Sequence, residues 1–393
     1  MRDKNIAWSF LEEITVLDCS VFLPGPYCTM MLAELGANVI KVERVSSGDP
    51  VRAGTPAFFR YLNGNKKLVT LDLKKKRGVE IFLELAKRSD VVVEGFRPGV
   101  VKRLGIDFET VKEVNPSIIY CSISGYGQTG PYAHIPGHDI NYLGPAGILG
   151  ISGDPESGPD FSHGFQVADI SGAMFALSSI LAALLRSIES SPAVYLDVSM
   201  TESAAMWALP RFLEYMDRGK PSKAELMARG SYGVFETRDG QYLTLGVIEE
   251  NFWASLCNIL GFDDLARDTS LKGWIPRNLQ RERIVPRLKK AIKEKDLDYW
   301  LEKFLEADIP ASPVKDFNNW MHDPQLKYRR FLTVDDHGEV DLNRMKRFPV
   351  NSLTRPDCTT EEEPSLGKDT STVLQGIGLS QEDVHLLKED KII

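Results

Sequence analysis

Apolar and polar residues alternate in two different rhythms along the first half of the chain. Short, nearly continuous apolar runs predict β-strands at 14–20, 37–44, 67–73, 91–96 and 117–127. Between them, helical spacing of apolar residues predicts helices over about 26–35 and 77–88, where Val79, Phe82 and Ala86 share one stripe. Such βα alternation with fully apolar strands is typical of an α/β protein with a mostly parallel sheet covered on both faces.

Ligands of open parallel sheets bind beyond the carboxyl ends of the strands. Four loops are therefore the places to search for a site. They are residues 22–26 (FLPGP), 43–50 (ERVSSGDP), 96–99 (FRPG) and 124–142 (SGYGQTGPYAHIPGHDINY).

The pattern changes in the second half of the chain. A long apolar helix is predicted over 166–187, a strand over 193–200 and a helix over 202–216; the stretch Ala173–Leu185 is too short for a membrane span and predicts a buried helix. Two alternating strands at 233–247 flank Asp239-Gly240, a strong hairpin signal. Helices are then predicted at 251–260, 280–294 and 297–306, and Ser380 is positioned to cap a last helix.

These elements predict a division into domains. We expect a large Rossmann-like domain made of 1–200 with 326–393, linker helices in 201–229 and a small α+β domain in 230–325.

Composition narrows the class of protein. A net charge of -8 over 393 residues gives no general affinity for a phosphate backbone, so no nucleic acid partner is expected. The five cysteines form no CxxC pair and predict reduced thiols without a metal site. The first residues are charged and lack the apolar core of a signal peptide, so we expect a cytoplasmic protein.

Three residues are candidates for chemistry, each with a structural alternative. His138 is either a residue that exchanges a proton near neutral pH or a structural histidine hydrogen-bonded in its loop. The neighbouring Asp139 is either a loop cap or a catalytic group. Asp169 stands where the long helix begins, so it predicts either an N-cap or a functional carboxylate kept ionised by the helix dipole. The small residues after it would let free N–H groups hold an oxyanion. Glu249 predicts a helix cap or a catalytic carboxylate.

Basic residues gather near the strand ends of the first half, where some would suit a diphosphate and a 3′-phosphate and others would be ordinary surface charges. They are Arg44, Lys66, Lys67, Lys74 to Arg77, Arg97, Lys102 and Arg103. No GxGxxG follows the first strand and no GxxxxGK[ST] is present, so neither a dinucleotide fingerprint nor a P-loop is predicted.

Longer motifs carry a family resemblance. The segments LPGPYCTMMLAELGANVIKVER, NKKLVTLDLK, EGFRPGVVKRLG, YCSISGYGQTGP, GHDINY, DGQYLTLGV and GLSQEDVHLL occur in this order over nearly the whole chain. The series resembles the family III CoA transferases, which include carnitine CoA-transferase, formyl-CoA transferase and α-methylacyl-CoA racemase. The resemblance implies a Rossmann-like domain completed by the C-terminal segment, a small domain, and an interlocked homodimer.

The resemblance also implies a substrate and its site. Coenzyme A would be bound as an acyl-CoA, with no metal or redox cofactor and no membrane partner. Because CoA is anionic, its site must be locally basic against the acidic chain. The positions that match the family's CoA-binding motifs are Arg44, Asn65, Lys66, Arg97, Gly125 and Tyr126.

The resemblance leaves three functions open. In the racemases the aspartate that matches Asp169 acts as an acid or base together with a histidine that matches His138, and a glutamate that matches Glu249 supports that histidine. In the transferases the same aspartate is a nucleophile that takes the acyl group from acyl-CoA, and CoA passes to a carboxylic acid. FLPGP, with Leu23 at the catalytic Gln position of the formyl transferase, favours the racemase, whereas SYGVFETRDG is more similar to the transferases and 152–162 matches neither. We favour the racemase, with CoA transfer as the alternative and a non-catalytic CoA-binding subunit as the third.

Overall fold

The computed structural model describes residues 10–153, 158–161, 164–186, 192–335, 337, 339–341, 345–350 and 364–393. The chain divides into two compact units. Unit 1 contains Met1–Leu149, Phe161–Leu209 and Pro324–Ile393, and unit 2 contains Gly150–Asp160 and Pro210–Asp323.

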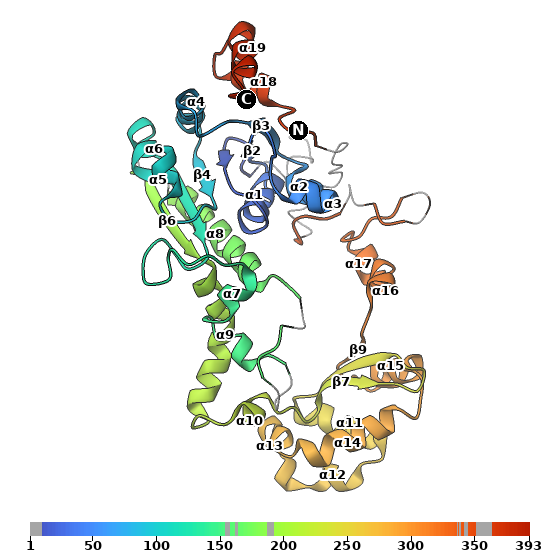
Figure 1. Ribbon diagram of the computed structural model, residues 1–393. Helices are drawn as coiled ribbons and strands as arrows, with labels where there is room; N and C mark the ends of the chain where they lie inside the picture. Colours follow the sequence, from blue (N-terminus) through green and yellow to red (C-terminus); the bar gives the residue numbers. More distant parts are fainter. Residues whose placement is uncertain are drawn as a thin grey trace. The chain divides into compact units, whose positions relative to one another are not determined.

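Unit 1 is built on a parallel sheet whose strand order is β3-β2-β1-β4-β5-β6 (Figure 1). The strands are β1 (Thr15–Asp18), β2 (Asn38–Glu43), β3 (Lys67–Thr70), β4 (Val91–Glu94), β5 (Ile119–Ser124) and β6 (Val194–Ser199). Each predicted strand of this half is confirmed. The chain order reverses between the neighbours β1 and β4, the point where open α/β sheets bind ligands.

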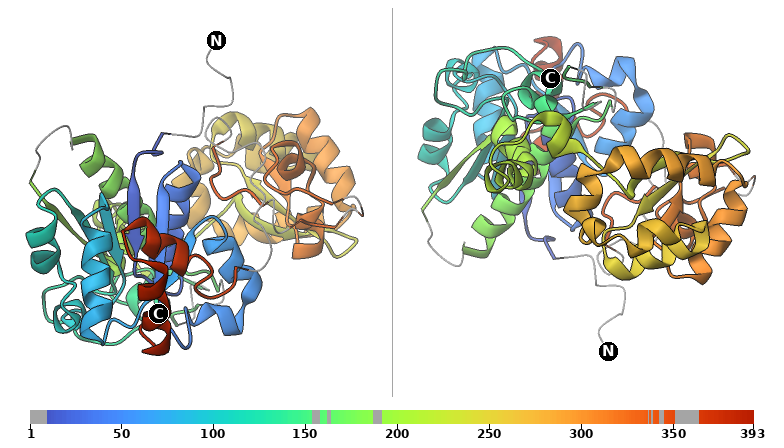
Figure 2. Two further views of the ribbon diagram at one scale, coloured as in Figure 1. Left: turned by 90° about the horizontal axis from the view of Figure 1, so that it is seen from above. Right: turned by 90° about the horizontal axis from the view of Figure 1, so that it is seen from below.

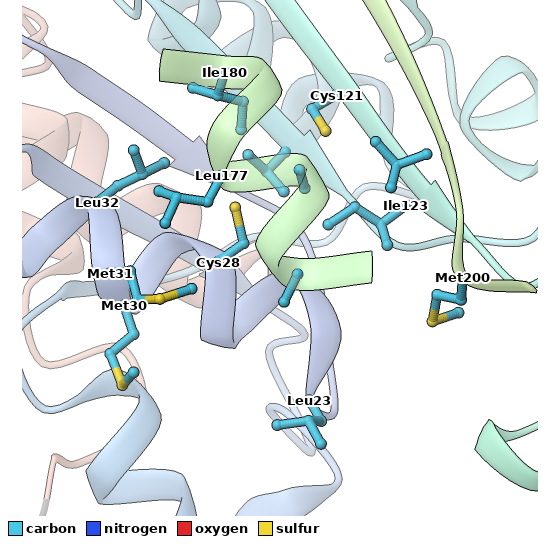
Figure 3. Close-up of a cluster of buried hydrophobic side chains, with 14 of the residues drawn as sticks. Leu23, Cys28, Met30, Met31, Leu32, Cys121, Ile123, Leu177, Ile180 and Met200 are labelled. Carbon is cyan, nitrogen blue, oxygen red and sulfur yellow. The ribbon is translucent and has the colours of Figure 1, made fainter. Parts of the chain in front are cut away.

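Helices cover both faces of this sheet, as the apolar strands predict. On one face α1 (Pro24–Glu34) and α8 (Val167–Arg186) bury Cys28, Leu32, Leu177 and Ile180 against β5 (Figure 3). On the other face α4 (Lys76–Ala86), α6 (Phe108–Val114) and the pair α18 (Thr370–Gly376) and α19 (Gln381–Glu389) share a second apolar cluster (Figures 1 and 2). The smaller elements of unit 1 are α2 (Val51–Gly54), α3 (Pro56–Asn63), α5 (Val100–Leu104), α7 (Asp139–Leu143) and α17 (Pro324–Tyr328). The short helix η1 (Leu149–Ile151) begins at the last residue of this part of unit 1 and continues into unit 2.

Helix α8 is long and apolar enough to cross a membrane, judged by length and composition alone. A core helix of a globular protein passes the same test, and α8 packs against α1, β5 and β6. We therefore describe it as the central helix of one face of the sheet.

Unit 2 has its own core. Strands β7 (Tyr232–Glu236), β8 (Tyr242–Gly246) and β9 (Ala311–Pro313) form an antiparallel sheet, and the predicted hairpin at Asp239-Gly240 is confirmed, with Gly240 at φ 75°. The helices are α10 (Lys223–Met227), α11 (Glu250–Leu260), α12 (Asp263–Arg267), η2 (Thr269–Leu271), α13 (Trp274–Leu279), α14 (Arg281–Ile292), α15 (Leu297–Glu306) and α16 (Phe317–Met321). Their core contains Trp253, Leu288 and Phe304.

The units differ from the predicted domains at two places. Helix α9 (Met200–Asp217) passes from unit 1 to unit 2 at Pro210, inside the segment predicted as linker helices. The described residues of Gly150–Asp160 group with unit 2, whereas the sequence placed them in the large domain; Lys223 Nζ donates to Ser152 O at 2.8 Å and holds that segment there.

The cysteines that the structure describes are free thiols: Cys19, Cys28, Cys121 and Cys257. All four are buried. Cys358 lies outside the described residues.

Candidate active site

A pocket of about 1400 Å³ opens in unit 1 at the carboxyl ends of the strands. Its wall is formed by the loops that follow β1 to β5 and by the first turn of α8. Residues from all four loops selected from the sequence line it. The pocket therefore lies where the strand order predicts a ligand site.

Asp169 lies in this wall, in the first turn of α8, and its backbone N–H is hydrogen-bonded to the side chain of Asp139. Asp139 Oδ1 accepts the backbone N–H groups of Ala168 (2.7 Å) and Asp169 (3.0 Å), so Asp139 caps α8 and Asp169 does not. Burial, with Asp139 as a second cause, raises the pKa of Asp169 to about 7. The expectation that Asp169 stays ionised is wrong, because burial and the neighbouring Asp139 carboxylate both favour its neutral form.

The first turn of α8 also offers no vacant oxyanion site. The N–H groups of Ala168 and Asp169 are bound by Asp139, and that of Ile170 donates to Gln166 O at 3.1 Å. Gly172 serves packing, since a Cβ there would lie 2.7 Å from Met200 Cγ. The prediction that a ligand approaches the backbone at these small residues is therefore wrong, because their N–H groups are already hydrogen-bonded and Met200 packs against Gly172.

His138 lines the same pocket at the start of α7 and is exposed to it. Its backbone N–H donates to Asn141 Oδ1 at 3.0 Å, and its ring meets the edge of Phe22, with centroids 6.2 Å apart. Phe22 adopts a left-handed backbone (φ 65°) and its N–H donates to Asp49 Oδ1 at 3.2 Å. The β1 loop thus supports one side of the imidazole.

Four of the predicted CoA-binding residues line the pocket: Arg44, Arg97, Gly125 and Tyr126. The Arg97 turn is fixed by Glu94, whose Oε2 accepts the Phe96 N–H at 2.7 Å. Gly125 has no room for a side chain, because a Cβ would come within 2.2 Å of the Tyr142 ring. The glycine therefore lets Tyr142 pack behind this wall.

The other two predicted CoA-binding residues do not reach the pocket wall. Lys66 is 4% exposed, and its Nζ donates to Asp18 (3.0 Å), Thr29 (2.7 Å), Asn63 (2.9 Å) and the Pro26 carbonyl (2.9 Å). An ammonium has three protons, so none remains for a phosphate. The structure corrects Lys66 to a buried structural cation. Asn65 donates to Glu34 Oε1 at 2.7 Å and is likewise absent from the wall.

Glu249 belongs to unit 2 and is not part of this wall. It occupies the N-cap position of α11, as the structural alternative predicts, although its side chain forms no capping bond. Its neighbour Glu250 pairs with Arg277.

Sequence reasoning missed part of the basic wall. Lys388 and Lys391, from the end of α19, line the pocket together with Lys74 and Lys75. No motif marks the two distant lysines, and only the fold brings them there. The pocket is locally basic in an acidic chain, as an anionic ligand requires. Among the described residues, no group of three His, Cys, Asp or Glu side chains lies together as a metal site.

Comparisons with known proteins give the pocket its context. The family described as CoA-transferase family III matches residues 11–370. The chain is 31% identical to an acyl-CoA transferase of Fusarium pseudograminearum, covering 100% of this chain and 90% of that protein. It is 30% identical to human succinyl-CoA:glutarate CoA-transferase (93% and 86% covered) and 29% identical to human alpha-methylacyl-CoA racemase (98% and 97% covered).

The fold is similar to that of solved structures. A CAIB/BAIF family protein from Brucella suis superposes with a TM-score of 0.79 at 27% identity, covering 94% of this chain and 99% of that one. Rv3272 from Mycobacterium tuberculosis gives a TM-score of 0.78 at 25% identity, with 92% and 98% covered.

Proposed function

Because this chain belongs to CoA-transferase family III, whose members are acyl-CoA enzymes, we propose that it moves a proton at the α-carbon of a 2-methylacyl-CoA thioester. The observation that carries the proposal is the shared pocket of Asp169 and His138, with the pKa of Asp169 raised to about 7. A group with a pKa near the working pH is populated in both proton states, which suits general acid–base catalysis.

The proposed reaction uses the two groups on opposite sides of the α-carbon. One side chain removes the α-proton, and the electrons of that C–H bond pass into the thioester as an enolate. The other side chain returns a proton to the opposite face, which inverts the centre. Burial of Asp169 favours its neutral form, so the carboxyl can give its proton back at neutral pH.

The same pocket supports binding of the CoA portion. Arg44 and Arg97 are exposed cations on its wall, suited to the diphosphate, and Tyr126 adds an aromatic surface. The proposed proton transfer calls on no metal or redox cofactor.

The test is deuterium uptake. Wild type and His138→Ala are incubated in deuterated water with a chiral 2-methylacyl-CoA, and α-deuterium is followed by mass spectrometry. We expect uptake by wild type and a loss of about 10²-fold or more in the variant, the usual scale for a general acid or base.

A matched control is His134→Ala, which removes an exposed histidine of the same loop that does not line the pocket. That variant should exchange at the wild-type rate. Uptake that survives His138→Ala unchanged would contradict the assignment of His138.

CoA transfer is the second candidate, favoured by the 30% identity to succinyl-CoA:glutarate CoA-transferase. In that reaction the Asp169 carboxylate attacks the thioester carbonyl and displaces the CoA thiolate, giving a mixed anhydride. CoA thiolate would then attack the aspartyl carbonyl of this anhydride, release the donor acid as its carboxylate and leave an aspartyl-CoA thioester. The acceptor carboxylate would displace the CoA thiolate from that thioester as a second anhydride, and thiolate attack on the acceptor's acyl carbonyl would give the new acyl-CoA and free Asp169. Hydroxylamine added with acyl-CoA would trap Asp169 as a hydroxamate, and a protein mass unchanged by that treatment would count against transfer.

We also propose the interlocked homodimer implied by the family resemblance. Helices α8 and α9 expose large apolar side chains in unit 1: Met174, Phe175, Met206 and Trp207, the last 62% exposed. Exposed apolar area of this kind marks a protein interface. Light scattering on the purified chain should give twice the mass of 44.0 kDa, and a monomer would refute the dimer.

A further inference from the structure

Helix α19 ends in a motif that normally requires glycine. The N–H of Ile392 donates to Leu387 O (2.8 Å) and the N–H of Lys391 donates to Lys388 O (3.0 Å), the two bonds of a Schellman motif. The left-handed position of that motif, usually glycine, is Lys391, with φ 53°. A β-carbon is disfavoured in this conformation, so glycine can replace this lysine without strain.

The motif aims the end of α19 at the pocket. The Asp72 N–H donates to Ile392 O at 2.8 Å, and Ile392 and Ile393 are buried in the apolar cluster of unit 1. This contact docks residues 388–393 beside the loop that follows β3. Lys388, Lys391, Lys74 and Lys75 consequently share one part of the pocket wall.

Two of these four lysines are already engaged elsewhere. Lys75 Nζ donates to the carbonyls of Asp390 (2.5 Å) and Lys391 (3.2 Å), and so satisfies the end of α19. Lys388 Nζ lies 3.3 Å from Ser371 Oγ. In the part of the chain that the structure describes, the ammonium groups of Lys74 and Lys391 have no recorded hydrogen bond or ion pair. Of the four lysines, these two are the ones whose ammonium groups are available to a ligand.

The lysines and the proton-transfer groups line different parts of one long pocket. Lys74 follows β3, the edge strand, whereas Tyr126 follows β5, beside the His138 and Asp169 region. Four strand spacings separate β3 from β5, or about 19 Å at about 4.8 Å each. A ligand that fills this pocket carries its reacting carbonyl at one end and an anion at the other.

We propose that Lys391 and Lys74 bind the 3′-phosphate of coenzyme A. The inference rests on the proposed function, in which a CoA thioester is the substrate. The 3′-phosphate lies on the adenosine end of CoA, away from the thioester, and a lysine ammonium binds phosphate as a point charge. Lys391 and Lys74 would then hold the phosphate from two segments that are far apart in the sequence.

The test compares CoA with 3′-dephospho-CoA by calorimetry at one fixed ionic strength. Wild type should bind CoA about tenfold more tightly, the scale of one charge-assisted hydrogen bond. Lys391→Gly should lose about tenfold in affinity for CoA and nothing for 3′-dephospho-CoA. Because glycine suits φ 53°, this variant should also melt no lower than wild type. Lys74→Ala should reduce the preference for CoA in the same direction.

Lys220→Gly is the matched control. Lys220 has the same left-handed backbone (φ 61°) and does not line the pocket, so its substitution should change neither affinity. Wild type that binds both ligands equally, or Lys391→Gly and Lys74→Ala proteins that keep the wild-type preference, would overturn the proposal. An equal loss for both ligands in Lys391→Gly would also overturn it and would assign the lysine to the diphosphate.

The same experiment separates this inference from the proposed function. Wild type that binds neither ligand would defeat both. If wild type binds CoA and exchanges the α-proton, but Lys391→Gly and Lys74→Ala keep the wild-type preference for CoA over 3′-dephospho-CoA, only the 3′-phosphate assignment is defeated.

Discussion

Asp18 and Asp169 are two carboxylates of unit 1 that lie largely out of water, yet their pKa values are shifted in opposite directions. Burial alone would raise the pKa of Asp18, but Lys66, Lys41 and the hydroxyls of Ser20 and Thr29 outweigh it and hold that pKa well below its usual value. Around Asp169 the main neighbouring charge is Asp139, which adds to burial and raises the pKa to about 7. The difference separates a carboxylate that holds the fold from one that is left able to exchange a proton.

Asp169→Asn should have the largest effect on the reaction. We expect the rate of α-proton exchange to fall by about 10³-fold, within the range for losing a general acid or base, because an amide cannot take up the proton. Calorimetry should show CoA binding within about twofold of wild type, since Arg44 and Arg97 remain. An Asp169→Asn protein that exchanges deuterium at the wild-type rate would remove Asp169 from the mechanism.

Lys66→Met should have the largest effect on stability. It leaves the Asp18 carboxylate buried without its closest cation, so the free energy of unfolding should fall by about 3 kcal/mol, as for a broken buried ion pair. Urea denaturation measures this loss. The double variant Asp18→Asn/Lys66→Met removes both charges and should recover part of it, whereas additive losses would deny the coupling.

Asp169→Asn should also change the pH dependence of stability, in a smaller way. Below about pH 4 the carboxyl is protonated in both the folded and the unfolded state, so the substitution should have little effect. Between about pH 4 and 7 the unfolded state loses its proton first, so wild-type stability falls as pH rises. Above pH 7 the variant should therefore be more stable than wild type by about 2 kcal/mol, about half of what the full pKa shift would give, because water reaches part of this carboxyl. Thermal melts at pH 4, 6 and 8 measure the gain, and a gain independent of pH would contradict the raised pKa.

Asp139→Asn should give the smallest effect. The amide oxygen can still accept the N–H groups of Ala168 and Asp169, while the charge beside Asp169 is lost. The pKa of Asp169 should then fall by about one unit or less, and the pH profile of kcat/KM should shift to lower pH. An unmoved profile would mean that burial alone sets this pKa.

Sequence patterns predicted the sheet because parallel strands are buried on both faces and therefore appear as unbroken apolar runs. They also located Asp169, His138 and Arg97, which follow recognisable elements. The patterns did not predict to which side of a strand a given side chain points. Lys66 and Lys67 are neighbours, yet Lys66 is buried and Lys67 is exposed, because successive side chains near a strand point to opposite sides.

Charge partners were equally invisible in the sequence. Asp139 adds to the effect of burial on the pKa of Asp169, but the two residues meet only because α7 packs against α8. Lys391 reaches the pocket through the contact of Ile392 with Asp72, across most of the chain length. Long-range contacts of this kind follow from the complete fold and from no local pattern.

The capping of α8 by Asp139 has a mechanical consequence. The backbone of Asp139 is joined by a peptide bond to His138, and its carboxylate accepts hydrogen bonds from the turn that carries Asp169. The start of α7 and the start of α8 are thereby tied at one point. A change of substrate shape accommodated by sliding either helix would carry the second group along with the first. In directed evolution, substitutions in the loop after β1 around Phe22 should therefore be the ones that admit larger substrates, because these hydrogen bonds do not hold that loop.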